Sequence, residues 1–153
     1  RHNSRAMALP HYRGRRAARL ENDVLRVTVL KEGGHIAEIL DKATGVNPLW
    51  TPPWPSIEPS AYDRARHPEY GGGVDASLLA GIMGHNLCLD IFGGPSDAEA
   101  AAGLPVHGEA SVARYEVELS GHTLVQRALL PLADLRVERR IQLSNQAGQL
   151  VGP

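Results

Sequence analysis

Cysteine is almost absent from this chain, which has Cys88 as its single thiol in 153 residues. One cysteine cannot form an intrachain disulfide, and it excludes zinc sites that are built from several cysteines. A chain without disulfides is typical of a reducing compartment. We therefore predict a cytoplasmic protein.

The chain also has almost no net charge. Its 16 lysines and arginines are balanced by 17 aspartates and glutamates, which gives a formal net charge of -1. A chain this close to neutrality has no overall electrostatic attraction to nucleic acid or to an anionic membrane. No apolar run approaches the roughly 20 residues that span a bilayer, and no N-terminal pattern is that of a signal peptide. We predict neither a nucleic-acid partner nor a membrane partner.

Acidic residues are missing from the first 16 positions, which are rich in arginine. We interpret residues 1–17 as a solvated basic N-terminal arm, with an arm that binds nucleic acid as the alternative. The remaining residues, 18–153, are enough for one domain with a core of its own.

Most of that domain has the alternation of apolar and polar residues that is typical of half-buried strands. Such segments occupy residues 25–30, 36–40, 113–119, 123–130 and 135–143. Glu32-Gly33-Gly34 predicts a hairpin turn between the first two, and the last three predict an antiparallel meander with one solvated face. The expected fold is all-β, an antiparallel β-sandwich.

The middle of the chain, residues 70–109, is rich in glycine and does not alternate. We interpret it as loops that carry a functional site on the β scaffold. Two apolar runs within it, residues 77–83 and 87–92, have the length of buried strands. One short helix is predicted after Ser96, because Glu99 follows at the spacing of a capping box and Gly103 ends the pattern.

No metal or cofactor is predicted. His85, Cys88 and His107 could supply three ligands, but nothing in the sequence fixes their geometry. Gly71-Gly72-Gly73 lacks the preceding buried strand that a dinucleotide-binding turn needs. Cys88 lies between two leucines, which favours packing as a small hydrophobic residue over nucleophilic chemistry.

Histidine and tryptophan are the residues left for chemistry and recognition. His107 is followed by Gly108, which allows a ligand to approach closely, and an imidazole can both give and take a proton near neutral pH. Trp50 and Trp54 flank a proline-rich stretch that cannot be helical. They either pin this loop to the core or stack on the face of a sugar.

Several of these segments resemble a known family. LENDVLRVTVLKEGGHIAEILDKATGVNPLW, residues 20–50, is similar to the N-terminal strands of aldose 1-epimerases and the wider galactose mutarotase-like group. AAGLPVHGE, residues 101–109, resembles that family's H-G motif, whose histidine lies in the sugar-binding cleft. His85 and Asn86 fall where the family places a polar residue that contacts substrate hydroxyls. The family's Asn-Arg pair ahead of the H-G motif has no counterpart here.

The resemblance implies a mutarotase-like β-supersandwich that binds a monosaccharide and interconverts its anomers. In that chemistry a carboxylate takes the C1 hydroxyl proton while a histidine protonates the ring oxygen, and the ring opens and recloses. His107 matches the first family histidine and is the candidate catalytic residue. The second histidine and the glutamate base lie beyond the end of this sequence, so we interpret residues 18–153 as a domain truncated at its C-terminus.

Three functions remain open. The full-length protein is an aldose 1-epimerase-like isomerase that uses His107, or the fold only binds carbohydrate, or it is a structural β domain. The candidate substrate-binding residues are His85, Asn86, Trp50, Trp54 and Glu109. A truncated sandwich exposes sheet edges, so we also predict a homodimer formed through an edge strand.

Overall fold

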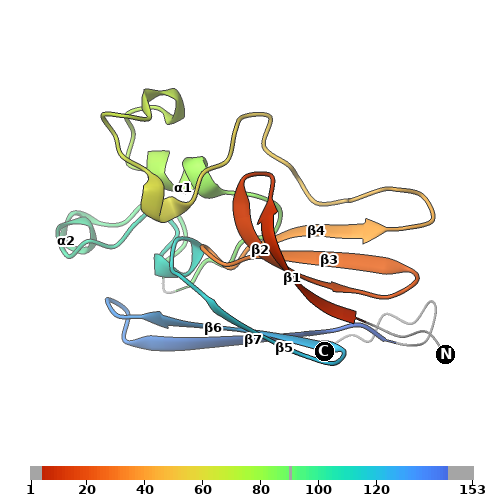
Figure 1. The fold of residues 1–153 in the computed structure, drawn as a ribbon. Helices are drawn as coiled ribbons and strands as arrows, with labels where there is room; N and C mark the ends of the chain where they lie inside the picture. Colours follow the sequence, from red (N-terminus) through yellow and green to blue (C-terminus); the bar gives the residue numbers. More distant parts are fainter. Residues whose placement is uncertain (1–4, 90, 145–153) are drawn as a thin grey trace.

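The fold is all-β and consists of two antiparallel sheets that face each other (Figure 1). The computed structural model of the chain describes residues 5–89 and 91–144. The first sheet contains β1 (Arg5–Tyr12), β2 (Arg15–Glu21), β3 (Leu25–Leu30) and β4 (Ile36–Asp41). The second contains β5 (Glu116–Ser120), β6 (Thr123–Leu130) and β7 (Leu135–Gln142). Both sheets run in sequence order, as simple meanders.

The strands follow the alternation in the sequence. β3 and β4 form the predicted hairpin, and β5, β6 and β7 form the predicted meander. Along β6, the side chains of Leu124, Gln126, Ala128 and Leu130 are buried, whereas Arg127 and Leu129 between them are exposed. This period of two places one face of the strand on the core and leaves much of the other in solvent.

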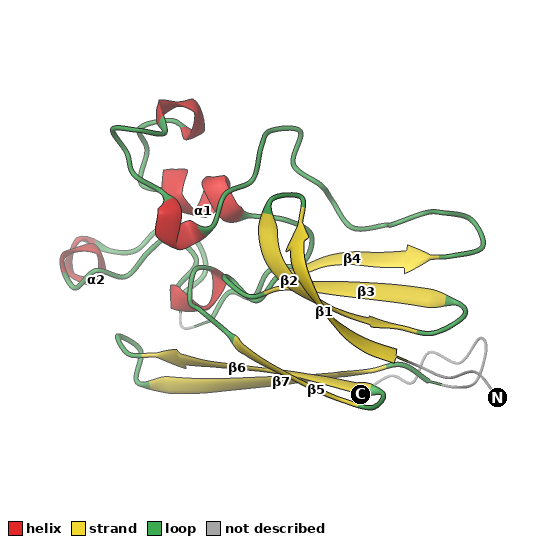
Figure 2. Cartoon of the chain, in the orientation of Figure 1, coloured by secondary structure: helices red, strands yellow, loops and turns green. Residues whose placement is uncertain are grey.

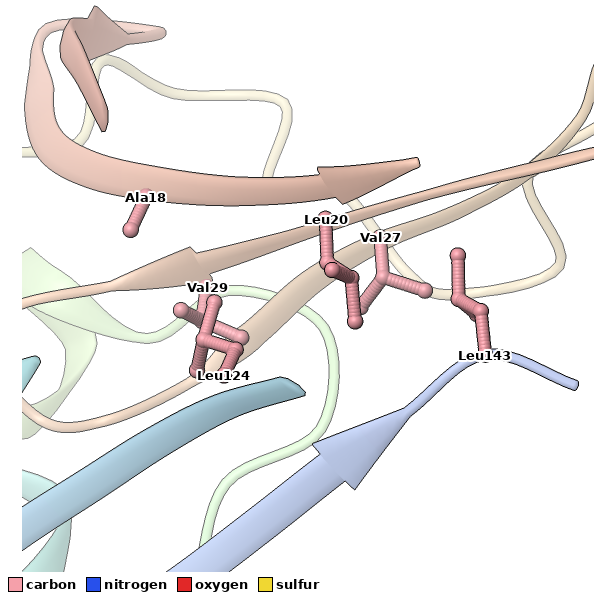
Figure 3. Packing of buried hydrophobic residues seen from close by; sticks show 6 residues of the cluster. All are labelled: Ala18, Leu20, Val27, Val29, Leu124 and Leu143. Atoms are coloured by element: carbon pink, nitrogen blue, oxygen red, sulfur yellow. The ribbon is translucent and has the colours of Figure 1, made fainter. Parts of the chain in front are cut away.

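The core between the sheets is a cluster of aliphatic side chains (Figure 3). Leu20, Val27 and Val29 from the first sheet pack against Leu124 of β6 and Leu143 just beyond β7. Leu20, Val29 and Leu124 are completely buried. The predicted β-sandwich is therefore confirmed.

The predicted basic arm is wrong for the part of residues 1–17 that the structure describes. Residues 5–12 form β1, and the expected boundary at residues 17 and 18 falls inside β2. Ala17 and Ala18 are both buried, in clusters on opposite faces of the sheet. The sequence did not reveal these strands, because the start of β2, Arg-Arg-Ala-Ala-Arg, does not alternate between apolar and polar residues.

The helical segments lie at one end of the sandwich (Figure 2). The predicted short helix is confirmed as α2 (Asp97–Ala101), with Ser96 and Glu99 in a complete capping box. A second helix, α1 (Ala76–Gly81), forms where the sequence predicted a strand. Alanine and leucine are strong helix formers, and α1 buries Ala76, Leu78 and Ala80.

The connections also contain three short 3₁₀ helices, η1 (Pro59–Ala61), η2 (Pro68–Tyr70) and η3 (Glu109–Ser111). The second predicted strand of the middle region, residues 87–92, is irregular where it is described. Its Leu87 and Leu89 pack against the cluster around Tyr115 and Leu130 at the end of the second sheet. None of the helices among the described residues is long and apolar enough to cross a bilayer.

Candidate functional site

His107 lies in the loop between α2 and η3 and has a left-handed backbone conformation, with φ of 64°. Two hydrogen bonds to one residue hold it there. The His107 amide donates to the Gly93 carbonyl at 2.9 Å, and the Gly93 amide donates to His107 Nδ1 at 2.9 Å. The imidazole is thus fixed to the loop before α2.

The bond to Nδ1 sets the tautomer of this ring. A nitrogen that accepts an N–H bond carries no proton, so the neutral imidazole has its proton on Nε2. The ring of Phe92 lies against His107 edge-on, with 5.1 Å between centroids and an interplanar angle of 61°. Phe92 is 87% exposed, which is unusual for a large apolar side chain. The imidazole of His107 and the exposed ring of Phe92 therefore lie side by side.

His85 and Asn86 follow α1 and are attached to the edge of β4. The amide and the carbonyl of His85 bond to the carbonyl and the amide of Ile36, each at 2.9 Å. This pair makes an isolated antiparallel bridge. It leaves the His85 side chain exposed and that of Asn86 half-buried, so both are accessible to a ligand.

The two tryptophans lie next to that bridge. Gly84, just before His85, donates its amide to the Trp50 carbonyl at 2.8 Å. The Trp50 and Trp54 rings meet edge-to-face at 5.6 Å, and Trp54 Nε1 donates to the Leu79 carbonyl at 3.0 Å. Trp54 therefore pins the loop to α1, whereas Trp50 is 49% exposed and remains available for stacking.

Glu109 differs from the other candidates because the fold itself uses its carboxylate. The side chain is only 7% exposed, and its oxygens accept the amides of Leu132 at 3.2 Å and Ala133 at 2.9 Å. These amides belong to the turn between β6 and β7. Glu109 therefore has a structural role. The sequence had predicted only a role in substrate binding for this residue.

The structure thus brings four of the six candidates together. The Trp50 and Trp54 rings are in contact, and the Trp50 carbonyl bonds to Gly84, next to His85 and Asn86, while His107 is held by Gly93. Among the described residues no hydrogen bond or ring contact joins His107 to the group around His85. The sequence did not predict a role for Phe92. The only feature of the sequence that distinguishes this residue is that it is the single phenylalanine of the chain.

The sequence also did not predict a buried ionic cluster that lies beside β2. Arg15 is fully buried; its Nε donates to Glu58 at 3.1 Å, and one of its other nitrogens donates to the Glu32 carbonyl at 2.9 Å. Burial lowers the pKa of Arg15, and Glu58 opposes that shift. Hydrogen bonds from Ser60 and Arg16 hold the pKa of Glu32 below its usual range in spite of burial. Buried charges need such partners, so this cluster joins β2 to the loop before α1.

A cavity of about 1310 Å³ lies beside β5, β6 and β7. Glu109 is the only candidate that lines it. Its wall mixes aliphatic side chains with charges of both signs, and Arg127 is paired with Glu118 and Glu138. The described residues contain no group of three or more acidic, histidine or cysteine side chains placed to hold a metal ion.

Comparisons of the chain with protein families, with curated proteins and with solved structures found no match.

Proposed function

We propose that this chain is a carbohydrate-binding β-sandwich in which His107 and Phe92 hold a monosaccharide. The observation that carries the proposal is the two-point attachment of His107 to Gly93, beside a phenylalanine that is almost fully exposed. A fixed N–H donor next to an apolar surface suits a ligand that has both hydroxyl groups and an apolar face.

The chemistry of a sugar ring matches these two side chains. The C–H groups of one face of a pyranose can pack on the Phe92 ring, and large exposed apolar side chains commonly mark binding sites. The Nε2–H of His107 can donate to a sugar oxygen, and an oriented N–H loses little entropy on binding. These features support the monosaccharide ligand that the resemblance implies.

In its full-length form the protein acts on this ligand as an aldose 1-epimerase. A carboxylate removes the proton of the C1 hydroxyl, while the Nε2–H of the neutral His107 donates a hydrogen bond to the ring oxygen and stabilises the negative charge that develops there. The bond between C1 and the ring oxygen breaks and leaves an open-chain aldehyde. The freed oxygen then attacks either face of the aldehyde, and the carboxylic acid returns its proton to the C1 oxygen.

A second candidate, binding without catalysis, is favoured by the position of Trp50. Its indole is half-exposed, and its carbonyl accepts the amide of Gly84, next to His85 and Asn86, whose polar side chains can bond to sugar hydroxyls. An aromatic surface with neighbouring hydrogen-bonding groups is sufficient for recognition. No proton transfer is needed at such a site.

The test uses His107→Asn, with His122→Asn as the matched control. Asparagine tolerates a left-handed backbone, and its side-chain oxygen can replace Nδ1 as acceptor for the Gly93 amide. His122 is exposed in the turn between β5 and β6. Binding of glucose and galactose is measured by NMR titration, and anomer exchange by magnetisation transfer between the α and β C1 protons, in full-length protein.

We expect His107→Asn to abolish anomer exchange and His122→Asn to leave it unchanged. Phe92→Ala should weaken sugar binding about two- to tenfold, since an aromatic contact contributes roughly 0.5–1.5 kcal/mol. Binding that persists in all three variants but is lost in Trp50→Ala would favour the second candidate. Absence of any sugar binding in the unchanged protein would contradict both.

A further inference from the structure

His35 occupies the turn between β3 and β4 and is completely buried. Neither of its ring nitrogens has a hydrogen-bond partner among the described residues. Buried polar groups are normally paired, so an imidazole without partners at the centre of a fold needs a physical explanation. We propose that His35 is a pH-sensitive lock, which holds this turn between the two sheets while it is neutral and releases it when it is protonated.

The backbone of Gly33 lies close to the ring of His35. A Cβ placed on Gly33 would lie 2.6 Å from His35 Cε1 and 2.5 Å from the Ser111 carbonyl oxygen. The backbone at Gly33 therefore passes directly against the imidazole, and only glycine allows this approach. The ring therefore cannot shift toward Gly33 when it is protonated.

Positive charge faces the ring from both sheets. Arg15 of β2 and Arg139 of β7 disfavour a charged imidazole, and His85 acts in the same direction. Tyr115 packs against the neighbouring Gly34, and burial raises the pKa of this phenol, so it brings no negative charge. A protonated His35 would lie among groups that repel it.

The two carboxylates of this region are already in use. Glu32 accepts from Arg16 at 2.9 Å and from Ser60 at 2.8 Å and 2.9 Å. Glu58 accepts from Arg15 at 3.1 Å and from the Arg16 amide at 2.6 Å. Neither carboxylate bonds to the ring of His35. The added proton therefore has no acceptor in the closed structure.

Burial and the two guanidinium groups lower the pKa of His35 from 6.5 to about 3. When the turn opens, water solvates the ring and its pKa returns toward 6.5. The open form therefore binds one more proton between these two values. Opening is least favourable above pH 6.5, and its equilibrium constant rises up to about tenfold for each unit that the pH falls below 6.5.

Opening of the turn would break several contacts around it. Gln126 Nε2 reaches the Leu30 carbonyl at 3.4 Å and the Gly34 carbonyl at 3.5 Å, and Arg139 also donates to the Gly34 carbonyl. The adjacent Ile36 holds the bridge to His85. Undocking of the turn would therefore also release the His85–Asn86 segment, a consequence for sugar binding that rests on the proposed function. The lock itself does not depend on that function.

The test compares the unchanged chain with His35→Phe, which keeps an aromatic ring and removes the titratable group, and with His122→Asn as the control. Amide hydrogen exchange of Leu30, Ile36 and His85 is followed from pH 7 to 5 and corrected for the intrinsic exchange rate. The Cε1 proton shift of His35 is followed by NMR over the same range. This window lies above the region where most carboxylates titrate.

We expect protection of these amides to fall by about 15-fold between pH 6.5 and 5 in the unchanged chain and in His122→Asn, and to stay constant in His35→Phe. The NMR shift of His35 in the folded protein should remain that of a neutral ring at pH 5. If His35→Phe does not fold, this NMR measurement and the pH slope of the unchanged chain still decide the matter. Titration of His35 near 6.5 in the folded state, or equal pH slopes in all foldable variants, would overturn the proposal.

Discussion

Single residues set the approach of the two sheets at the β3–β4 turn. Gly34 has φ of 61°, and a Cβ there would lie 2.7 Å from the Tyr115 ring. Gly45, in the turn after β4, has φ of 73° but no atom within 4 Å of the same position. Both glycines therefore have a positive φ, but only Gly34 lies against a neighbouring side chain.

Gly34→Ala should lower the free energy of unfolding more than Gly45→Ala does. Both changes place a side chain in the left-handed region, at roughly 1–2 kcal/mol. Gly34→Ala also forces the Tyr115 ring to move, which adds about 1–3 kcal/mol. Urea unfolding of both variants measures the difference, and equal losses would show that the Tyr115 contact is not tight.

At the scale of elements, one carboxylate joins two parts of the chain that are distant in sequence. Glu109 begins η3, directly after the His107 loop, and it accepts amides from the turn between β6 and β7. The loop that carries His107 is thereby anchored to the second sheet.

Glu109→Gln should destabilise the protein by about 1–3 kcal/mol, because an amide can accept only one of the two N–H groups and presents a donor to the other. Glu116→Gln, at an exposed position of β5, is the control and should change stability by less than about 0.5 kcal/mol. Thermal and urea unfolding report these values. A Glu109→Gln variant with full stability and lost sugar binding would instead support the direct contact with substrate predicted from sequence.

For the whole molecule, the stability of the sandwich depends on the aliphatic layer between its sheets. Leu124 and Leu129 belong to the same strand, but Leu124 is fully buried in this layer and Leu129 is 65% exposed on the outer face. This pair offers an internal comparison of burial at constant side-chain chemistry.

Leu124→Ala should cost about 2–5 kcal/mol, as buried leucines do when a cavity replaces them. Leu129→Ala should stay within about 0.5 kcal/mol. Calorimetry or urea unfolding checks both, and a small effect at Leu124 would mean that the two sheets are not closely packed. The homodimer predicted from exposed edges stays a prediction, for light scattering to test.

Local pattern was enough to predict the strands and one helix. The alternation along residues 25–30, 123–130 and 135–143 fixes which face of each strand is apolar, and Ser96 with Glu99 signals a helix start that depends only on neighbours in sequence. Each of these signals is complete within about ten residues. They predicted the sandwich and α2 before any long-range contact was known.

Tertiary structure decided what these local patterns could not. Whether residues 77–83 form a strand or a helix depends on the surface that they cover, because a short apolar run fits both periods. The partners of Arg15, Glu109 and His107 lie 14 to 66 residues away in the chain. Whether a side chain joins a charge cluster, anchors a turn or is held as a fixed imidazole depends on such distant partners. These partners cannot be recognised when a sequence is interpreted one segment at a time.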